Sequence, residues 1–129
     1  MSTAENKELV RRYFDERWNH GNLSICDELL APSFSIEAHE EWVRSIYAAF
    51  GNIQMTILDL LAEGDQVAVH WRFAGTHQGD YLGVAAMGKA VTFQGLTLLR
   101  IADGKIVDDV AYWDDLLVLE QLAATPSAS

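Results

Sequence analysis

The stretch VTFQGLTLLRIADGKIVDDVAYW, residues 91–113, decides the fold of this 129-residue chain. Apolar side chains alternate with polar ones on both sides of Asp103-Gly104, a dipeptide that favours a tight turn between two strands. The stretch therefore predicts an antiparallel hairpin with strands over 91–101 and 106–113.

A two-residue turn places Ile101 opposite Ile106, and this register assigns the faces of the hairpin. The predicted inner face carries the cross-strand pairs Leu99 with Asp108, Thr97 with Val110, Gly95 with Tyr112, and Phe93 with Asp114. Gly95 lacks a side chain, so the sheet has room to bend there. The predicted outer face carries Leu96, Leu98, Val107 and Trp113. An apolar outer face predicts that a second copy of the chain covers it, and we expect a homodimer.

Outward from the hairpin, the two-residue period continues over 53–62 and 66–76, joined by Glu63-Gly64. Helical spacing occurs over 3–19, with Ser2 and Glu5 at capping-box distance, over 23–30 and over 40–50. Residues 34–37 predict a short strand, 77–90 a loop, and Asp114 or Asp115 the start of a final helix. Helices followed by an antiparallel meander indicate an α+β fold, with helices on one face of a curved sheet. We expect one domain over 1–124 and a flexible tail over 125–129.

Composition excludes several classes of function. The formal charge is -10, from 19 acidic and 9 basic residues, which argues against nucleic-acid binding and against docking on anionic membranes. The N-terminus lacks signal-peptide features, and no apolar run has the length of a membrane span, so we expect a cytoplasmic protein. The single cysteine, Cys26, lies in an apolar helical stretch and predicts a buried, inert thiol.

Asp114 is the candidate acid–base residue, because the predicted register puts it beside Phe93 and Tyr112 on the inner face. Apolar surroundings raise the pKa of a carboxyl group towards neutrality. An aspartate before an apolar helical run is equally typical of an N-cap, unless Asp115 serves as the cap. Tyr112 is the candidate hydrogen-bond partner. The expected pocket lining comprises Tyr13, Phe14, Trp18, Trp42, Trp71, Phe73, His77, Phe93 and Val110.

Other chemistry lacks support in the sequence. The remaining histidines are expected at the surface: His70 on the outer face, and His20 and His39 in solvent. No HxH, HxxxH, GxGxxG, P-loop or GxSxG pattern occurs, so we expect neither a metal nor a cofactor.

Eight motifs in this order make the chain recognisable as a whole: NKELVRRYF (6–14), WNHGNL (18–23), DELLAPSF (27–34), EGDQVA (63–68), GTHQG (75–79), GKAVTF (88–93), DGKIV (103–107) and WD (113–114). The chain resembles the SnoaL-like polyketide cyclases, in the nuclear-transport-factor-2-like (NTF2-like) superfamily of cone-shaped domains. The resemblance implies a pocket for an apolar small molecule and a cofactor-free aldol closure. It also implies an acid–base aspartate near the end of the last strand, which Asp114 matches.

The chain departs from the family pattern in one region that matters for function. Only residues 35–41 join Phe34 to the next predicted helix, where relatives carry a longer, often His-containing roof over the pocket. The leading hypothesis is a cyclase or isomerase acting on an apolar carbonyl compound, and the alternative is a non-catalytic binding domain. Epoxide hydrolysis, which uses an Asp-Arg-Asp set in this superfamily, is weaker because the register puts Arg100 on the outer face.

Overall fold

The computed structural model describes residues 2–123, and it begins with a helix whose cap matches the sequence prediction. In α1 (Thr3–Phe14) the Glu5 amide donates to Ser2 Oγ at 3.1 Å, and the Ser2 amide donates to Glu5 Oε1 at 3.0 Å. This reciprocal pair satisfies two amides that a helix N-terminus otherwise leaves unpaired. The capping-box prediction is confirmed.

The first helix continues without a break into a π-helical turn, η1 (Asp15–Asn19). Its characteristic bond runs from the His20 amide to the Asp15 carbonyl at 3.2 Å, five residues apart. The short helix α2 (Ser24–Leu29) follows and buries Ile25, Cys26 and Leu29.

The third helix, α3 (Ile36–Ala49), begins four residues earlier than predicted. The predicted strand at 34–37 is therefore wrong. Its alternating pattern was too short to distinguish a strand from a first helical turn, and the His39 amide donates to the Ser35 carbonyl at 3.0 Å. The earlier start adds a helical turn that contains His39.

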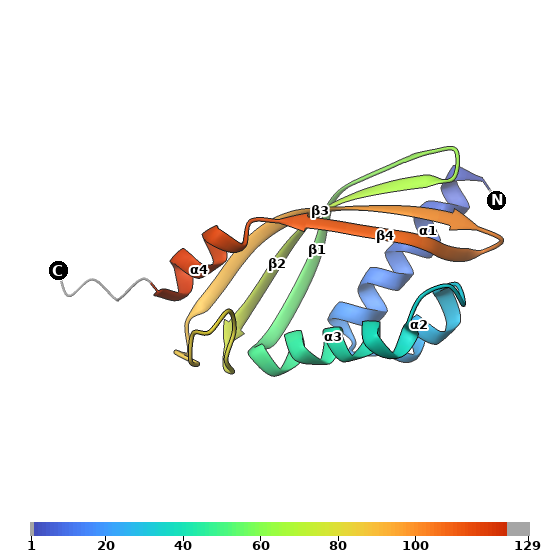
Figure 1. Ribbon diagram of the computed structural model, residues 1–129. Coiled ribbons are helices and arrows are strands. Elements are labelled where there is room, and N and C mark those ends of the chain that lie inside the picture. The colour runs from blue at the N-terminus through green and yellow to red at the C-terminus, as the bar shows by residue number, and fades with distance from the viewer. Residues whose placement is uncertain (1, 124–129) are drawn as a thin grey trace.

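Four strands form one antiparallel meander in the order β1 (Phe50–Glu63), β2 (Gln66–His77), β3 (Ala90–Ala102) and β4 (Lys105–Trp113). Helices α1, α2 and α3 lie against one face of the sheet, and α4 (Asp115–Ala123) lies beyond the end of β4 (Figure 1). The α+β prediction is confirmed. The predicted tail over 125–129 lies outside the described residues.

The register of the last hairpin differs from the predicted one beyond the turn. Ile101 does pair with Ile106, but Arg100 then pairs with Asp108, so Val107 is an extra residue in a β-bulge. Because side chains alternate along a strand, one inserted residue reverses the faces of the rest of β4. Asp109, Ala111 and Trp113 face inwards, whereas Asp108, Val110 and Tyr112 face outwards.

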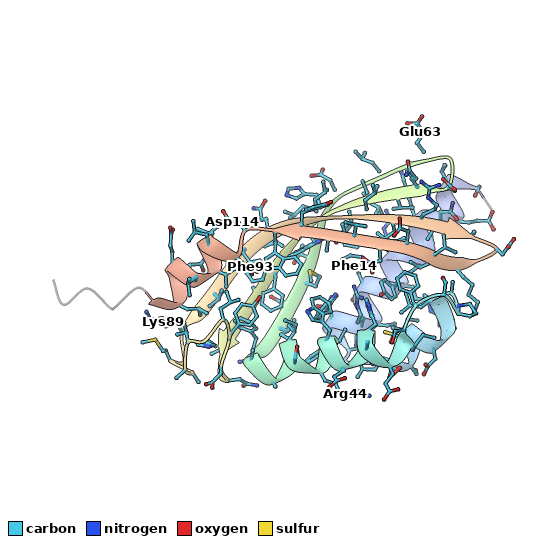
Figure 2. The ribbon with its side chains drawn as sticks, viewed as in Figure 1. Phe14, Arg44, Glu63, Lys89, Phe93 and Asp114 are labelled. Atoms are coloured by element: carbon cyan, nitrogen blue, oxygen red, sulfur yellow. The ribbon has the colours of Figure 1, made fainter. Side chains whose placement is uncertain are left out.

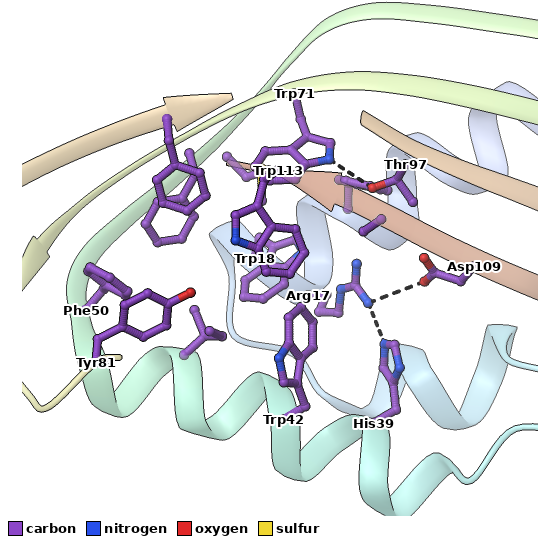
Figure 3. Close-up of a pocket in the computed structure, with 16 residues that line it drawn as sticks. Arg17, Trp18, His39, Trp42, Phe50, Trp71, Tyr81, Thr97, Asp109 and Trp113 are labelled. Carbon is purple, nitrogen blue, oxygen red and sulfur yellow. Dashed lines mark hydrogen bonds and ion pairs between the residues drawn. The ribbon is translucent and has the colours of Figure 1, made fainter. Parts of the chain in front are cut away.

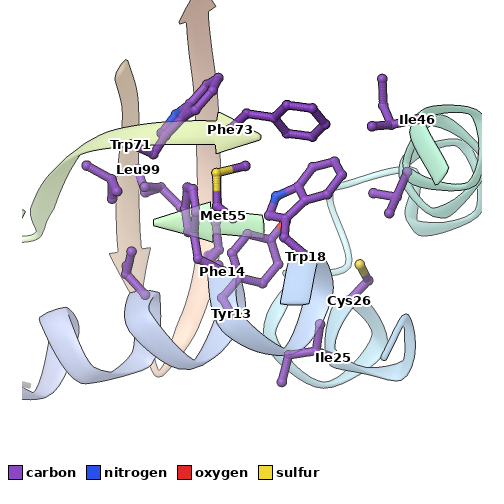
Figure 4. Close-up of a cluster of buried hydrophobic side chains, with 14 of the residues drawn as sticks. Tyr13, Phe14, Trp18, Ile25, Cys26, Ile46, Met55, Trp71, Phe73 and Leu99 are labelled. Atoms are coloured by element: carbon purple, nitrogen blue, oxygen red, sulfur yellow. The ribbon is translucent and has the colours of Figure 1, made fainter. Parts of the chain in front are cut away.

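The core lies between the sheet and the helices, where Phe14 and Phe93 are both buried (Figure 2). Tyr13 and Trp18 contribute aromatic rings from the N-terminal helices, and Met55, Trp71 and Leu99 pack against them from the sheet (Figure 4). The core side chains do not fill all of the space between the sheet and the helices, and they leave a cavity.

Within residues 2–123, no helix has the length and apolar character needed to cross a membrane.

Candidate active site

A cavity of about 310 Å³ lies between the inner face of the sheet and helices α1, η1 and α3 (Figure 3). Most of its lining is apolar or aromatic. The lining residues are Phe14, Arg17, Trp18, His39, Trp42, Ile46, Phe50, Met55, Trp71, Phe73, Tyr81, Phe93, Thr97, Asp109, Ala111 and Trp113. A small organic molecule is the kind of ligand that such a cavity suits.

All four tryptophans of the chain line this cavity. Trp18 meets Trp42 edge-on with ring centroids 5.7 Å apart, and Trp113 lies 6.2 Å from both Trp42 and Trp71. These rings come from η1, α3, β2 and β4, so the wall forms only when the whole fold assembles. The polar edge of Trp71 is satisfied, because its Nε1 donates to Thr97 Oγ1 at 2.8 Å.

One end of the cavity is polar and contains Arg17, His39 and Asp109 (Figure 3). The side chains of Arg17 and Asp109 are only 4% and 8% exposed, and Nη1 of the arginine lies 3.9 Å from Oδ2 of the aspartate. Arg17 Nη1 also lies 2.6 Å from Nε2 of His39 and donates to the hydroxyl of Tyr13. That hydroxyl lies 2.9 Å from His39 Nε2 and 3.4 Å from Asp109 Oδ2.

The environment of this polar end changes the protonation of its members. Burial lowers the pKa of His39, the charge of Arg17 lowers it further, and Asp109 opposes both. Burial also raises the pKa of Tyr13 far above its ordinary value, against the opposing effect of Arg17. His39 is therefore neutral and Tyr13 keeps its proton at neutral pH.

The other end of the cavity carries a second hydrogen-bonded group. Trp113 Nε1 donates to Asp115 Oδ1 at 2.6 Å, and the hydroxyl of Tyr81 donates to the same oxygen at 3.3 Å. Burial, together with the charge of Asp115, raises the pKa of Tyr81 to about 12. Tyr81 thus remains a neutral hydrogen-bond donor at this end.

Six of the nine residues predicted to line the pocket do so: Phe14, Trp18, Trp42, Trp71, Phe73 and Phe93. Tyr13 and His77 are fully buried and lie outside the lining, although the Tyr13 hydroxyl reaches its polar end. Val110 lies on the outer face because of the bulge, so its predicted position in the pocket is wrong.

The two residues predicted to be catalytic also lie elsewhere. Tyr112 pairs with Leu96 on the outer face and is 68% exposed. Asp114 accepts a hydrogen bond from the Leu117 amide at 3.0 Å, as an N-cap of α4 does. The predicted placement of both residues on the pocket face was wrong, because it assumed a hairpin without a bulge.

Sequence reasoning missed the three residues of the polar end of the cavity, Arg17, His39 and Asp109. Arg17 stands four residues after Tyr13 and next to Trp18, on the apolar stripe of its helix, and this spacing was a usable signal. His39 stands three residues before Trp42, which places it on the same helical face once α3 begins at Ile36. Asp109 had no signal, because nothing local to the sequence announces the bulge.

In the described part of the chain, no three His, Cys, Asp or Glu side chains lie close enough together to hold a metal ion. Arg17 and Asp109 have opposite charges and lie in apolar surroundings. They provide a hydrogen-bond donor and an acceptor that both face one small cavity.

Known proteins share this architecture. Residues 8–122 match the family model described as SnoaL-like polyketide cyclase. A structure from Jannaschia sp. CCS1, provisionally assigned as a SnoaL-like polyketide cyclase, is 28% identical with a TM-score of 0.88, over 96% of this chain and 95% of that one. AclR from Streptomyces galilaeus, provisionally assigned as a hydroxylase, is 26% identical with a TM-score of 0.86, over 97% of this chain and 100% of that one.

A third structure, from Acidithiobacillus ferrooxidans and provisionally assigned as a polyketide cyclase, is 26% identical with a TM-score of 0.82. The alignment covers 95% of this chain and 97% of that one. No curated protein matches the sequence. The match of the family model spans most of the chain, and the solved structures agree with it in fold over nearly their full length. The chain therefore belongs to the SnoaL-like polyketide cyclase family.

Proposed function

We propose that this protein is a cofactor-independent cyclase or isomerase that moves a proton on an apolar carbonyl compound. The observation that carries the proposal is the side chain of Asp109, almost buried beside Arg17 at the polar end of an aromatic cavity. A carboxylate in such a place has lost most of its water and is a competent general base. The family membership supports the same class of reaction.

In the proposed reaction, Asp109 takes a proton from the carbon next to the substrate's carbonyl group. The electron pair of that C–H bond becomes the C=C bond of an enolate, and the negative charge moves to the carbonyl oxygen. In a cyclase, the enolate carbon then attacks a second carbonyl group, and Asp109 returns its proton to the new alkoxide. In an isomerase, the proton returns to another carbon. Either sequence balances without a further reactant.

Arg17 is the proposed stabiliser of the enolate oxygen. Its Nη1 is engaged by Tyr13 and His39, whereas Nη2 has no hydrogen bond to any residue in the range 2–123. A donor that is fixed before the reaction and shielded from water stabilises developing charge better than one in solution. Oδ1 of Asp109 likewise has no partner among the described residues, so both groups have a free atom for the substrate.

Two other functions would depend on the same cavity. A non-catalytic binding domain remains the alternative, because an aromatic cavity of this size also suits simple ligand capture. Epoxide hydrolysis gains no support, because the described lining contains one arginine and one carboxylate where that chemistry in this superfamily uses two carboxylates.

We also propose that the protein forms a homodimer through the outer face of the sheet. The bulge changes which residues form this face: Val110 and Tyr112 replace the predicted Val107 and Trp113 beside Leu96 and Leu98. A row of apolar residues crosses all four strands from Leu61 through Ala68 and Leu98 to Val110. We call the exposed members of this face, Leu61, Leu96, Leu98, Val110 and Tyr112, the outer patch. Burial of such a patch by a second copy removes apolar surface from water.

The test is exchange of the α-protons of 2-tetralone, an apolar aromatic ketone, for deuterium in buffered D2O, followed by NMR. We expect the protein to accelerate exchange and Asp109→Asn to lower the rate by about 10²- to 10⁴-fold. Asp114→Asn is the matched control, since it makes the same chemical change outside the cavity and should leave the rate unchanged. Tight binding of 2-tetralone without accelerated exchange would favour the binding-domain alternative.

A further inference from the structure

We infer that His39 is the positioning residue for Arg17: its Nε2 accepts a hydrogen bond from Nη1 and thereby holds the guanidinium against the polar end of the cavity. This inference deepens the proposed function, since it explains how the donor for the enolate oxygen is held. The contact itself exists whether or not the protein is an enzyme.

The direction of this hydrogen bond follows from the chemistry of the two groups. A guanidinium group has only N–H donors and stays protonated in proteins. The 2.6 Å contact between Arg17 Nη1 and His39 Nε2 therefore requires a lone pair on Nε2. The imidazole ring must be neutral, with its proton on Nδ1. A proton on Nε2 would set two donors against each other.

The rest of the network is consistent with this assignment. The two hydrogens of Arg17 Nη1 are used by His39 Nε2 and the Tyr13 hydroxyl. Since the single lone pair of Nε2 is then occupied, the hydroxyl proton of Tyr13 turns to Asp109 Oδ2, 3.4 Å away. Arg17 Nη1 thus donates to the Tyr13 hydroxyl, and that hydroxyl donates to Asp109.

Few other contacts hold the guanidinium in place. Its ion pair with Asp109 spans 3.9 Å, longer than a hydrogen bond, and Nε of Arg17 is buried without a partner among residues 2–123. Arg17 Cζ lies 4.0 Å from the ring centroid of Tyr13, 5.0 Å from that of Trp18 and 5.5 Å from that of Phe14, and contacts with ring faces are less directional than a hydrogen bond. Nη1 also donates to the Tyr13 hydroxyl on the continuous α1–η1 helix, and His39 supplies the directional contact that comes from a different helix, α3.

The titratable groups that face His39 come from three elements: Tyr13 from α1, Arg17 from η1 and Asp109 from β4. Among these groups Asp109 favours a charged imidazole, and Arg17 opposes it with the larger effect. Acidification that protonates His39 would break the bond to Nη1 and push the guanidinium away. The position of Arg17 is thus coupled to pH through a residue that does not itself touch the reacting atoms.

The first test needs no substrate: ¹⁵N NMR of the whole protein at pH 7.5, which reports the tautomer of His39 and the exchange of the Arg17 Nη hydrogens with water. We expect the Nδ1–H tautomer and slowly exchanging Nη1 hydrogens. Two variants separate the roles of shape and acceptor. His39→Gln keeps an acceptor that cannot be protonated at mild pH, and His39→Leu keeps the bulk without an acceptor. Slow exchange should survive in His39→Gln and disappear in His39→Leu.

The second test follows 2-tetralone exchange from pH 5 to 8. His39→Leu should lose about 10²-fold in rate, the scale of a misplaced catalytic group, and His39→Gln should retain most of it without the acid-side loss that His39 causes. The Nε2–H tautomer, or equal Arg17 exchange in all three proteins, would overturn the inference. An inactive wild-type protein with the expected NMR signals would instead refute the proposed function and leave the positioning role intact.

Discussion

Gly95→Ala is the substitution whose effect can be worked out most directly from the structure. Gly95 lies in β3 directly opposite Trp71, and the indole ring packs over it where a side chain would stand. A Cβ atom added at this position would contact Trp71 Cζ2 and lie 2.5 Å from Cη2 and 2.7 Å from Cε2. These distances are far inside van der Waals contact, so the ring must move.

The ring can move only by giving up contacts that it now makes. Displacement breaks the bond from Trp71 Nε1 to Thr97 Oγ1, a loss of about 1 kcal/mol. Repacking against Phe93 and Trp113 adds the usual cost of an overfilled core, about 1–3 kcal/mol. We therefore expect Gly95→Ala to lower the free energy of unfolding by about 2–4 kcal/mol. The displaced ring of Trp71 has space to move only towards the cavity, so it should also reduce the volume available to a ligand.

Urea unfolding followed by circular dichroism measures this effect, and Trp71→Phe provides the control background. Phenylalanine has a single ring without the fused-ring atoms Cζ2 and Cη2 and without the N–H group, so Gly95→Ala should cost much less in that background. An equal cost in both backgrounds would refute the reasoning, because the loss would then come from the backbone of β3. A loss below about 0.5 kcal/mol in the wild-type background, the size of a neutral surface change, would refute it as well.

Three further predictions concern other parts of the molecule. Leu98→Glu places a charge in the outer patch and should convert the proposed dimer to monomers in sedimentation velocity; a wild-type monomer at micromolar concentration would contradict the dimer. Since the folded state lowers the pKa of His39 from 6.5, the unfolded chain binds this proton first as the pH falls. The resulting stabilisation is complete above about pH 6.5 and is lost as the pH falls below it. His39→Gln should therefore remove part of the acid-side decline in the free energy of unfolding. Parallel pH profiles for the two proteins would contradict this prediction. Burial raises the pKa of the Cys26 thiol, so Ellman's reagent should react with it only after unfolding; fast stoichiometric reaction of the native protein would show that the thiol is accessible.

The sequence predicted the strands well because their signals are local. Two-residue alternation and the turns at 63–64 and 103–104 place all four strands within three residues of their observed ends. The aromatic wall was predictable for a similar reason, since large apolar side chains at regular spacing must face the core. Trp71 and Phe73 alternate on β2 and point inwards as the pattern requires.

The polar end of the cavity was not predictable, because it depends on departures from regular geometry. Val107 enters the strand as an extra residue, and no turn dipeptide or glycine marks it. Without the bulge, the alternation assigns Asp108 and Asp114 to the inner face and Asp109 to the outer one. His39 was misplaced for a related reason: the helix that contains it starts before its apolar periodicity becomes recognisable.

The bulge at Val107 and the π-helical turn at Asp15–Asn19 make the polar end of the pocket depend on two irregular segments of the backbone. Arg17 lies in one irregular segment, and Asp109 follows the other. Removal of the single codon for Val107 would delete the bulge and leave the pairing of Leu99 with Asp109 unchanged, so Asp109 should still face the cavity. A strand that kept Val107 in regular pairing would instead turn Asp109 outwards and Tyr112 inwards, so it is the unpaired extra residue that puts this carboxylate in the pocket. Column-by-column alignment with a relative that lacks the bulge would pair residues from opposite sides of the sheet.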